Sequence, residues 1–127
     1  MTHILVVDDE KNIRITMPAL LKSYCKRLGK PCEVSIAEDG SKALELLNAN
    51  GSSIDAVVSD INMLKVDGFK VYDTAVEKKL PCVLMTGDYK RNMEGLKQRN
   101  ITKDEILYKP FGKKELTWLI ERLENSK

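Results

Sequence analysis

Long apolar runs are missing from this sequence of 127 residues. No apolar stretch is long enough to cross a bilayer, and the N-terminus lacks the basic start and apolar stretch of a secretory signal peptide. Internal repeats, low-complexity tracts and linkers rich in proline or glycine are absent too. We therefore expect a single domain that spans residues 1–127, does not insert into a membrane and resides in the cytoplasm.

A strong charge of one sign is also lacking. The 21 basic and 19 acidic residues leave a formal net charge of +2, which is small for a domain that binds nucleic acid directly. The three cysteines, Cys25, Cys32 and Cys82, are odd in number and have no CxxC spacing, so neither a disulfide framework nor a zinc site is expected. Cys32 and Cys82 fall in predicted strands, where we expect buried, reduced thiols.

What the sequence does have is a regular alternation of short apolar runs and amphipathic segments. Runs that are apolar on both faces, as buried parallel strands are, occupy residues 4–7, 56–58, 82–85 and 106–108, whereas residues 34–37 alternate as an edge strand does. Apolar residues at helical spacing occupy 13–28, 43–47, 69–76, 93–101 and 116–123. Asp39 is a predicted helix N-cap, and Pro18 is expected to kink the first helix without ending it.

These elements are arranged as five strand–helix units. This order predicts an α/β fold with a parallel sheet, helices on both faces and right-handed crossovers. At this length, a flavodoxin-like, doubly wound, five-stranded parallel sheet with five helices is favoured over a barrel. The strand order that we expect for it is 2-1-3-4-5.

Polar residues stand where the predicted strands end. Asp8 and Asp9 follow the first strand, Asp60 the third, Thr86 the fourth and Lys109 the fifth. Ligands of open parallel sheets bind beyond the carboxyl ends of the strands, so these side chains should converge on one rim. Each signal alone has an ordinary structural explanation, such as a helix N-cap for an aspartate pair or a turn for a Lys-Pro pair.

Taken together, these five residues predict phosphoryl chemistry. Three carboxylates in one cleft repel one another, and a divalent cation with oxygen ligands, most suitably Mg²⁺, relieves that repulsion. A carboxylate held near Mg²⁺ can attack a phosphoryl group and form an acyl phosphate. The transferring group carries charge on three oxygens, which a metal ion, a lysine ammonium and a hydroxyl donor would stabilise.

Five segments resemble the response regulator receiver family, and together they span nearly the whole chain. They are ILVVDDE at residues 4–10, DGSKAL at 39–44, the stretch from DINM to DG at 60–68, LMTG at 84–87 and YKPF at 108–111. The resemblance implies that Asp60 is the phosphoacceptor, that Thr86 donates its hydroxyl to the phosphoryl group and moves on activation, and that Lys109 pairs with a phosphoryl oxygen. It also implies a cis Lys109–Pro110 bond and space for the phosphoryl group at Gly87.

The same resemblance implies a Mg²⁺ site. Asp8, Asp9 and Asp60 would bind the ion, with Asp9 in direct contact and Asp8 partly through water. The backbone carbonyl of Asn62 would be a further ligand. Asn62 and Asp88 flank the phosphoacceptor at positions that tune hydrolysis of the acyl phosphate, and we expect a short-lived phosphoryl group.

Two positions depart from the family pattern. Leu64 stands where the family usually has proline, which predicts a looser loop after Asp60. Ile106 occupies the position of the aromatic switch residue, so the usual coupling between Thr86 and an aromatic ring is in question. Tyr108 lies two residues further along the same strand face and could share that role.

A receiver of this kind relays a signal. A histidine kinase or a histidine phosphotransfer protein would donate a phosphoryl group to Asp60. Phosphorylation would then switch a protein-binding face made of the fourth helix, fifth strand and fifth helix. Such a domain is not an enzyme in the ordinary sense, although it assists its own phosphorylation and dephosphorylation. No output domain follows Lys127, so we expect a protein target, and the sequence leaves a phosphorylation-dependent homodimer open.

Two alternatives remain open from the sequence. A phosphatase of the haloacid dehalogenase type also combines a strand-end aspartate, a lysine and Mg²⁺, but it needs a DxD motif where this chain has the adjacent pair Asp8 and Asp9. A pseudo-receiver would act as an interaction module without phosphorylation. Ile106 and Leu64 favour that second alternative, and the intact acidic set opposes it.

Overall fold

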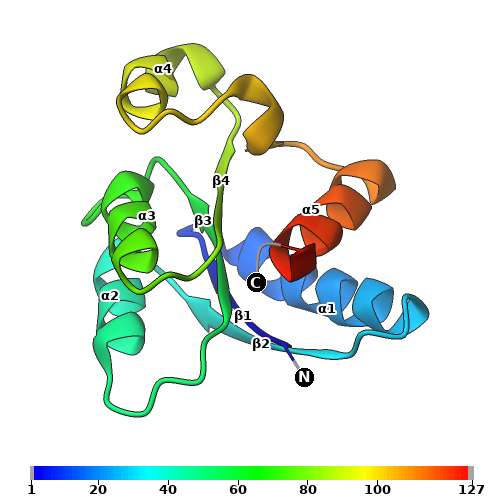
Figure 1. Cartoon of the computed structure of the whole chain (residues 1–127). Coiled ribbons are helices and arrows are strands. Elements are labelled where there is room, and N and C mark those ends of the chain that lie inside the picture. Colours follow the sequence, from blue (N-terminus) through cyan, green and yellow to red (C-terminus); the bar gives the residue numbers. More distant parts are fainter. Residues whose placement is uncertain (1, 126–127) are drawn as a thin grey trace.

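The strands form one all-parallel sheet in the order β2-β1-β3-β4-β5 in the computed structural model, which describes residues 2–125 (Figure 1). The strands are β1 Thr2–Val7, β2 Cys32–Ala37, β3 Ala56–Asp60, β4 Cys82–Thr86 and β5 Leu107–Tyr108. The predicted flavodoxin-like fold and strand order are therefore confirmed, including the place of residues 34–37 at an edge of the sheet.

Among residues 2–125, five α-helices and a short 3-10 helix connect the strands. They are α1 Lys11–Arg27, α2 Gly40–Asn48, α3 Gly68–Glu77, α4 Tyr89–Gln98, η1 Lys103–Glu105 and α5 Lys113–Asn125. Helices α1 and α5 cover one face of the sheet, and α2, α3 and α4 pack on the other (Figure 1). Asp39 caps α2 as predicted, because its carboxylate accepts a hydrogen bond from the backbone amide of Lys42 at 2.8 Å. None of the described helices is long and apolar enough to cross a membrane.

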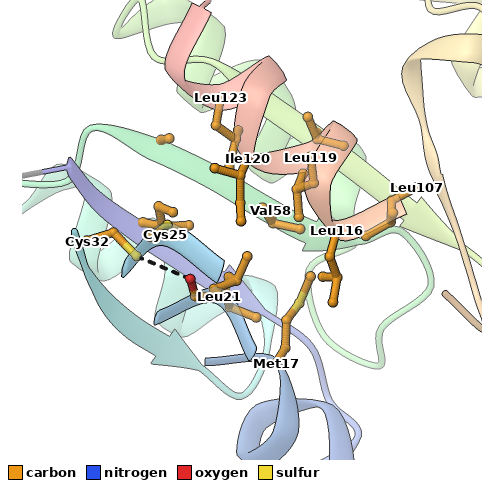
Figure 2. Packing of buried hydrophobic residues seen from close by; sticks show 14 of the residues in the cluster. Met17, Leu21, Cys25, Cys32, Val58, Leu107, Leu116, Leu119, Ile120 and Leu123 are labelled. Carbon is orange, nitrogen blue, oxygen red and sulfur yellow. Dashed lines mark hydrogen bonds between the residues drawn. The ribbon is translucent and has the colours of Figure 1, made fainter. Parts of the chain in front are cut away.

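The largest hydrophobic cluster lies between the sheet and the pair α1–α5. Leu116, Leu119 and Ile120 of α5 lie across from Met17 and Leu21 of α1, over the strands (Figure 2). Alternate residues of β1 and β3 point into this cluster, and the residues between them point into the cluster under α2 and α3. Both strands are therefore buried on two faces, which is why they read as continuous apolar runs. Each large aliphatic side chain that is fully buried contributes about 1.5–3 kcal/mol.

The three thiols are free. Cys25 and Cys32 both belong to this cluster, where the thiol of Cys32 donates a hydrogen bond to the carbonyl of Leu21 at 3.8 Å (Figure 2). Burial raises the pKa of Cys25 to about 12, and neighbouring Cys32 adds to the rise, so the Cys25 thiol stays protonated. The expectation of a buried thiol is confirmed for Cys32, whereas Cys82 is partly exposed.

The first helix buries most of the predicted stripe, with two exceptions. The sequence pattern assigns Leu20 and Leu28 to the buried face, but these side chains are 39% and 44% exposed. The buried positions, spaced by four, are Met17, Leu21 and Cys25. The helix continues past Pro18, so the prediction that this proline does not end it is confirmed.

The fourth helix and the last strand also differ from their predicted bounds. Helix α4 begins at Tyr89, earlier than predicted, because Asp88 caps it by accepting a hydrogen bond from the backbone amide of Arg91 at 3.2 Å. Ile101 lies beyond its end. Ile106 lies just before β5 rather than within it.

Two glycines hold the loop of residues 61–67 close to the sheet edge. A Cβ atom at Gly68 would overlap the carbonyl oxygen of Asp60, and one at Gly40 would overlap the carbonyl oxygen of Val66. The amide of Gly68 also donates to the carbonyl of Ile61 at 2.8 Å. The loop therefore turns back tightly after Asp60, and within it the side chain of Leu64 is 93% exposed.

Candidate functional site

Three carboxylates gather at the carboxyl edge of the sheet. In the parallel register, Val7 of β1 lies opposite Ser59 of β3, so Asp8 and Asp60 come next on neighbouring strands. One oxygen atom from each of Asp8, Asp9 and Asp60 lies within 4.8 Å of the others. Asp8 is completely buried and Asp60 is 6% exposed, whereas Asp9 is open to solvent.

Lys109 brings an ammonium group into this acidic cluster. Its Nζ atom lies 2.7 Å from Asp8 Oδ2 and 3.6 Å from Asp60 Oδ1. The same atom lies 3.0 Å from Glu10 Oε1, a contact that the sequence analysis did not foresee. The backbone amide of Lys109 donates to the carbonyl of Thr86 at 3.0 Å, which fixes the end of β5 beside β4.

Burial shapes the charge state of these groups. It raises the pKa of Asp60 to about 6; the ammonium of Lys109 opposes this rise, and the charges of Asp8 and Asp9 add to it. Burial also raises the pKa of Asp8, against the effect of its ion pair with Lys109. For Lys109, burial disfavours the charged form, but the close ion pair with Asp8 and the charge of Asp60 outweigh it and raise the pKa. The cluster thus combines several acids with the ammonium of Lys109, whose charged form these acids favour.

The donor set fits a hard divalent cation. Asp8 Oδ1 accepts a hydrogen bond from the backbone amide of Glu10 at 2.9 Å. Asp8 Oδ2 is buried and, although it forms the ion pair with Lys109, it accepts no hydrogen bond of acceptable geometry among the described residues. A buried carboxylate oxygen in that state is one that a cation would satisfy, and three carboxylates with water are a common Mg²⁺ environment.

A cavity of about 610 Å³ gives access to the cluster. Its polar wall includes Asp9, Glu10, Thr16, Asp60, Asn62, Gly87, Asp88 and Lys109, and its apolar wall includes Ile13, Pro110 and Phe111. A Cβ atom at Gly87 would lie 3.9 Å from the side chain of Lys109, an ordinary van der Waals contact, so this position is not crowded. The Lys109–Pro110 bond is cis, as predicted. Fold and site together define a flavodoxin-like domain with an acidic pocket at the carboxyl edge of its sheet.

Thr86 is brought to the same edge, and its hydroxyl is bonded to residues at the start of α4. The side chain is completely buried. Its Oγ1 atom accepts hydrogen bonds from the backbone amide of Asp88 and from Nδ2 of Asn92, both at 2.9 Å. The hydroxyl is therefore held toward α4.

Sequence reasoning missed Asn92, a buried residue that contacts Asn62 and Thr86 behind the pocket. It is 4% exposed and exchanges two hydrogen bonds with the side chain of Asn62, at 2.8 and 3.0 Å. The sequence pattern predicts Met93 and Leu96 as the buried face of the fourth helix, but Met93 is 38% exposed and Asn92 takes its place. The available signal was an amide side chain spaced by four from Leu96 on that face.

The two candidate switch positions near β5 differ in burial. Ile106 is buried against Leu84 of β4 and Leu96 of α4. Tyr108 is 37% exposed; its hydroxyl donates to the carbonyl of Lys103 at 3.1 Å, and its ring lies 6.3 Å from that of Tyr89. Tyr108 thus contacts the start of α4, whereas Ile106 offers only apolar packing.

Comparison with known proteins identifies the family. A family model for the response regulator receiver domain matches residues 4–121. The chain is 32% identical over 124 residues to a probable transcriptional regulator, ycf27, of Cyanidium caldarium, a match that covers 95% of this chain and 45% of that protein. It is 33% identical over 116 residues to the two-component response regulator ARR18 of Arabidopsis thaliana, covering 90% of this chain and 17% of that protein.

Solved structures of receiver domains agree with the family match. The response regulator receiver protein from Sinorhizobium medicae WSM419 has a TM-score of 0.69 at 27% identity, over 98% of this chain and 93% of that one. The receiver domain of the hybrid histidine kinase CckA has a TM-score of 0.64 at 25% identity, over 98% and 97%. The chain therefore belongs to the response regulator receiver domain family of two-component systems. It spans less than half of the length of the two curated relatives named above.

Proposed function

We propose that Asp60 accepts a phosphoryl group from a histidine kinase or a histidine phosphotransfer protein, and that residues 1–127 act as one receiver domain. The observation that supports this most strongly is the convergence of Asp8, Asp9 and Asp60 on the ammonium of Lys109 at an open cavity. The same side chains are the ones that phosphoryl transfer to a carboxylate requires.

The transfer would proceed by attack of an Asp60 oxygen on phosphorus. The new O–P bond forms as the N–P bond of the phosphohistidine breaks, and the released imidazole nitrogen keeps the electron pair. Asp60 must be ionised to attack, which its pKa of about 6 allows at neutral pH. Lys109, already 3.6 Å from Asp60 Oδ1, would pair with a phosphoryl oxygen, and Thr86 would turn its hydroxyl toward the group.

A Mg²⁺ ion would be held by Asp8, Asp9 and Asp60, with the backbone carbonyl of Asn62 as a further ligand. When bound, Mg²⁺ would supply positive charge to the oxygens of the transferring phosphoryl group. Gly87 has no side chain beside Lys109, so we expect those oxygens to fit there. Because Asp60 lies at the wall of the cavity, both the ion and the phosphoryl donor can reach it from solvent.

We expect a short-lived phosphoryl group, tuned by Asn62 and Asp88. Both residues line the cavity, but the amide of Asn62 is bonded to Asn92 and the carboxylate of Asp88 caps α4. Either side chain would have to leave its present partner to position an attacking water. Decay of a radiolabelled phosphoryl group over many hours at neutral pH would contradict this expectation.

The output would be a protein contact at the face formed by α4, β5 and α5, in the cytoplasm. Tyr108, Lys103 and Trp118 line a groove of about 320 Å³ on this face. A phosphorylation-dependent homodimer through the same face is a second form that the output could take. Neither a haloacid dehalogenase nor a pseudo-receiver is favoured, since the family match is to receivers and the acidic set is complete.

The proposal is tested by incubating the protein with acetyl phosphate and Mg²⁺ and measuring its intact mass. We expect a mass increase of one phosphoryl group in the wild type and in the control variant Asp104→Asn, which changes an exposed acid on η1. Asp60→Asn, and the wild type without Mg²⁺, should show no increase. An adduct of equal yield on Asp60→Asn would overturn the proposal.

A further inference from the structure

Asn92 joins three parts of the molecule through one buried amide. Its nitrogen donates to Oδ1 of Asn62 at 2.8 Å, to Oγ1 of Thr86 at 2.9 Å and to the carbonyl of Asp88 at 3.1 Å, three contacts that share two protons. Its oxygen accepts from Nδ2 of Asn62 at 3.0 Å. The amide therefore connects the end of β4 and the loop after β3 to the first turns of α4.

Two of the three partners of this amide lie beside Asp60, the proposed phosphoacceptor. Asn62 follows Asp60 by two residues, and Thr86 ends the strand next to β3. The hydroxyl of Thr86 is buried and bonded to Asn92 and to the amide of Asp88, so it cannot move toward Asp60 unless these bonds lengthen or α4 follows. In a buried network, losing one partner leaves a polar group unsatisfied. A displacement of Asn62 or Thr86 therefore changes the hydrogen bonds of the Asn92 amide.

The opposite end of α4 is anchored to α3. Arg99, just beyond α4, binds both carboxylate oxygens of Asp73 at 2.8 and 2.9 Å and lies 4.5 Å from the centre of the Phe69 ring. Gly95 packs against that ring so closely that a Cβ atom would overlap it. A displacement that begins at Asn92 is therefore confined to the first turns of α4.

Residue 106 is an isoleucine, so the usual coupling between Thr86 and an aromatic ring cannot pass through this position. Ile106 contributes only apolar packing against Leu84 and Leu96. We propose that Asn92 is the positioning residue that carries phosphorylation of Asp60 into α4. This inference rests on the proposed function: when Thr86 or Asn62 shifts toward the phosphoryl group, the bonds of the Asn92 amide change and the first turns of α4 move.

The test compares wild type, Asn92→Leu and the control Thr74→Val by intact mass and by backbone amide NMR shifts, before and after acetyl phosphate with Mg²⁺. Leucine has a similar size and cannot make the hydrogen bonds. Thr74 is a buried polar residue of α3 whose hydroxyl bonds only locally, to the carbonyl of Lys70 at 3.0 Å. We expect an adduct on all three proteins. Phosphorylation should shift the amides of residues 89–94 in wild type and control, and these shifts should fall several-fold in Asn92→Leu.

Wild-type shifts retained in phosphorylated Asn92→Leu would overturn the inference. Absence of an adduct on the wild type would instead reject the proposed function, so the two failures are distinguishable. If Asn92→Leu does not fold, the side-chain amide resonances of Asn92 in the wild type provide the same test. They should move on phosphorylation, and unchanged resonances would overturn the inference.

Discussion

The ammonium of Lys109 lies 2.7 Å from a fully buried oxygen of Asp8, and this contact ties the end of β5 to the end of β1 across the site. Removing it by Lys109→Met would leave a buried carboxylate without its counter-charge. We predict a loss of about 3 kcal/mol of folding stability near neutral pH in metal-free buffer. Because protonation of Asp8 removes the uncompensated charge, the loss should shrink as pH falls.

Urea unfolding at several pH values checks this prediction. Lys113→Met, at an exposed position of α5, is the matched control and should stay within about 0.5 kcal/mol of the wild type. A Lys109→Met variant as stable as the wild type at neutral pH would show that the ion pair does not balance the burial of Asp8.

Asp60 should destabilise the metal-free fold at neutral pH. Its pKa is about 6 in the folded protein against an ordinary value of 3.8 for a solvated aspartate, so between these values the folded state holds a proton that the unfolded state has lost. Stability therefore falls as pH rises through this window and levels off above it. We predict that Asp60→Asn is more stable than the wild type near neutral pH by up to about 3 kcal/mol, and that the gap closes toward about pH 4. Urea unfolding without metal measures this stability difference. A difference that widens as pH falls would refute the raised pKa of Asp60.

Mg²⁺ should raise the midpoint of thermal unfolding, because only the folded chain brings Asp8, Asp9 and Asp60 within reach of one ion. Asp9 is exposed, so Asp9→Asn should fold normally yet lose most of this gain. Glu94→Gln, at an exposed position of α4, should keep it. An equal Mg²⁺-dependent gain in Asp9→Asn would remove this residue from the metal site.

Gly68→Ala should destabilise the protein by about 3 kcal/mol, because the added methyl group would overlap the backbone of Asp60 and Ile61. The control is Gly112→Ala, where the added atom meets only a side-chain oxygen of Glu115 at 3.8 Å, and we expect a change within about 0.5 kcal/mol. Chemical denaturation of both variants measures the difference. Equal stabilities would mean that the backbone after Asp60 shifts to accommodate the added methyl group at little cost.

The fold and the residues at the strand ends could be predicted from the sequence because both follow from local patterns. Strands buried on two faces are continuous apolar runs, and parallel register brings their carboxyl ends to one edge. This is why the positions of Asp8, Asp60 and Lys109 at one rim could be reasoned from strand ends alone. The same reasoning wrongly placed Ile106 within the last strand, because nothing in the pattern separates an apolar residue just before a short strand from the strand itself.

The contacts between helices, strands and loops could not be predicted from local sequence patterns. The pairing of Asn92 with Asn62 and Thr86 depends on how α4 is placed over the sheet, and a lone asparagine in a polar helix gives little sign of burial. The 39% exposure of Leu20 likewise depends on how α1 is placed against the rest of the chain. Such tertiary placement decides which face of a helix is buried when several apolar stripes are available.

Reductive trapping of the acyl phosphate is the most direct test of the central claim. After incubation with acetyl phosphate and Mg²⁺, borohydride reduces an aspartyl phosphate to homoserine and releases phosphate, and peptide mass spectrometry locates the changed residue. We predict homoserine at residue 60 alone. Homoserine at another aspartate, or an unmodified residue 60 in protein that carries the phosphoryl group, would contradict the account.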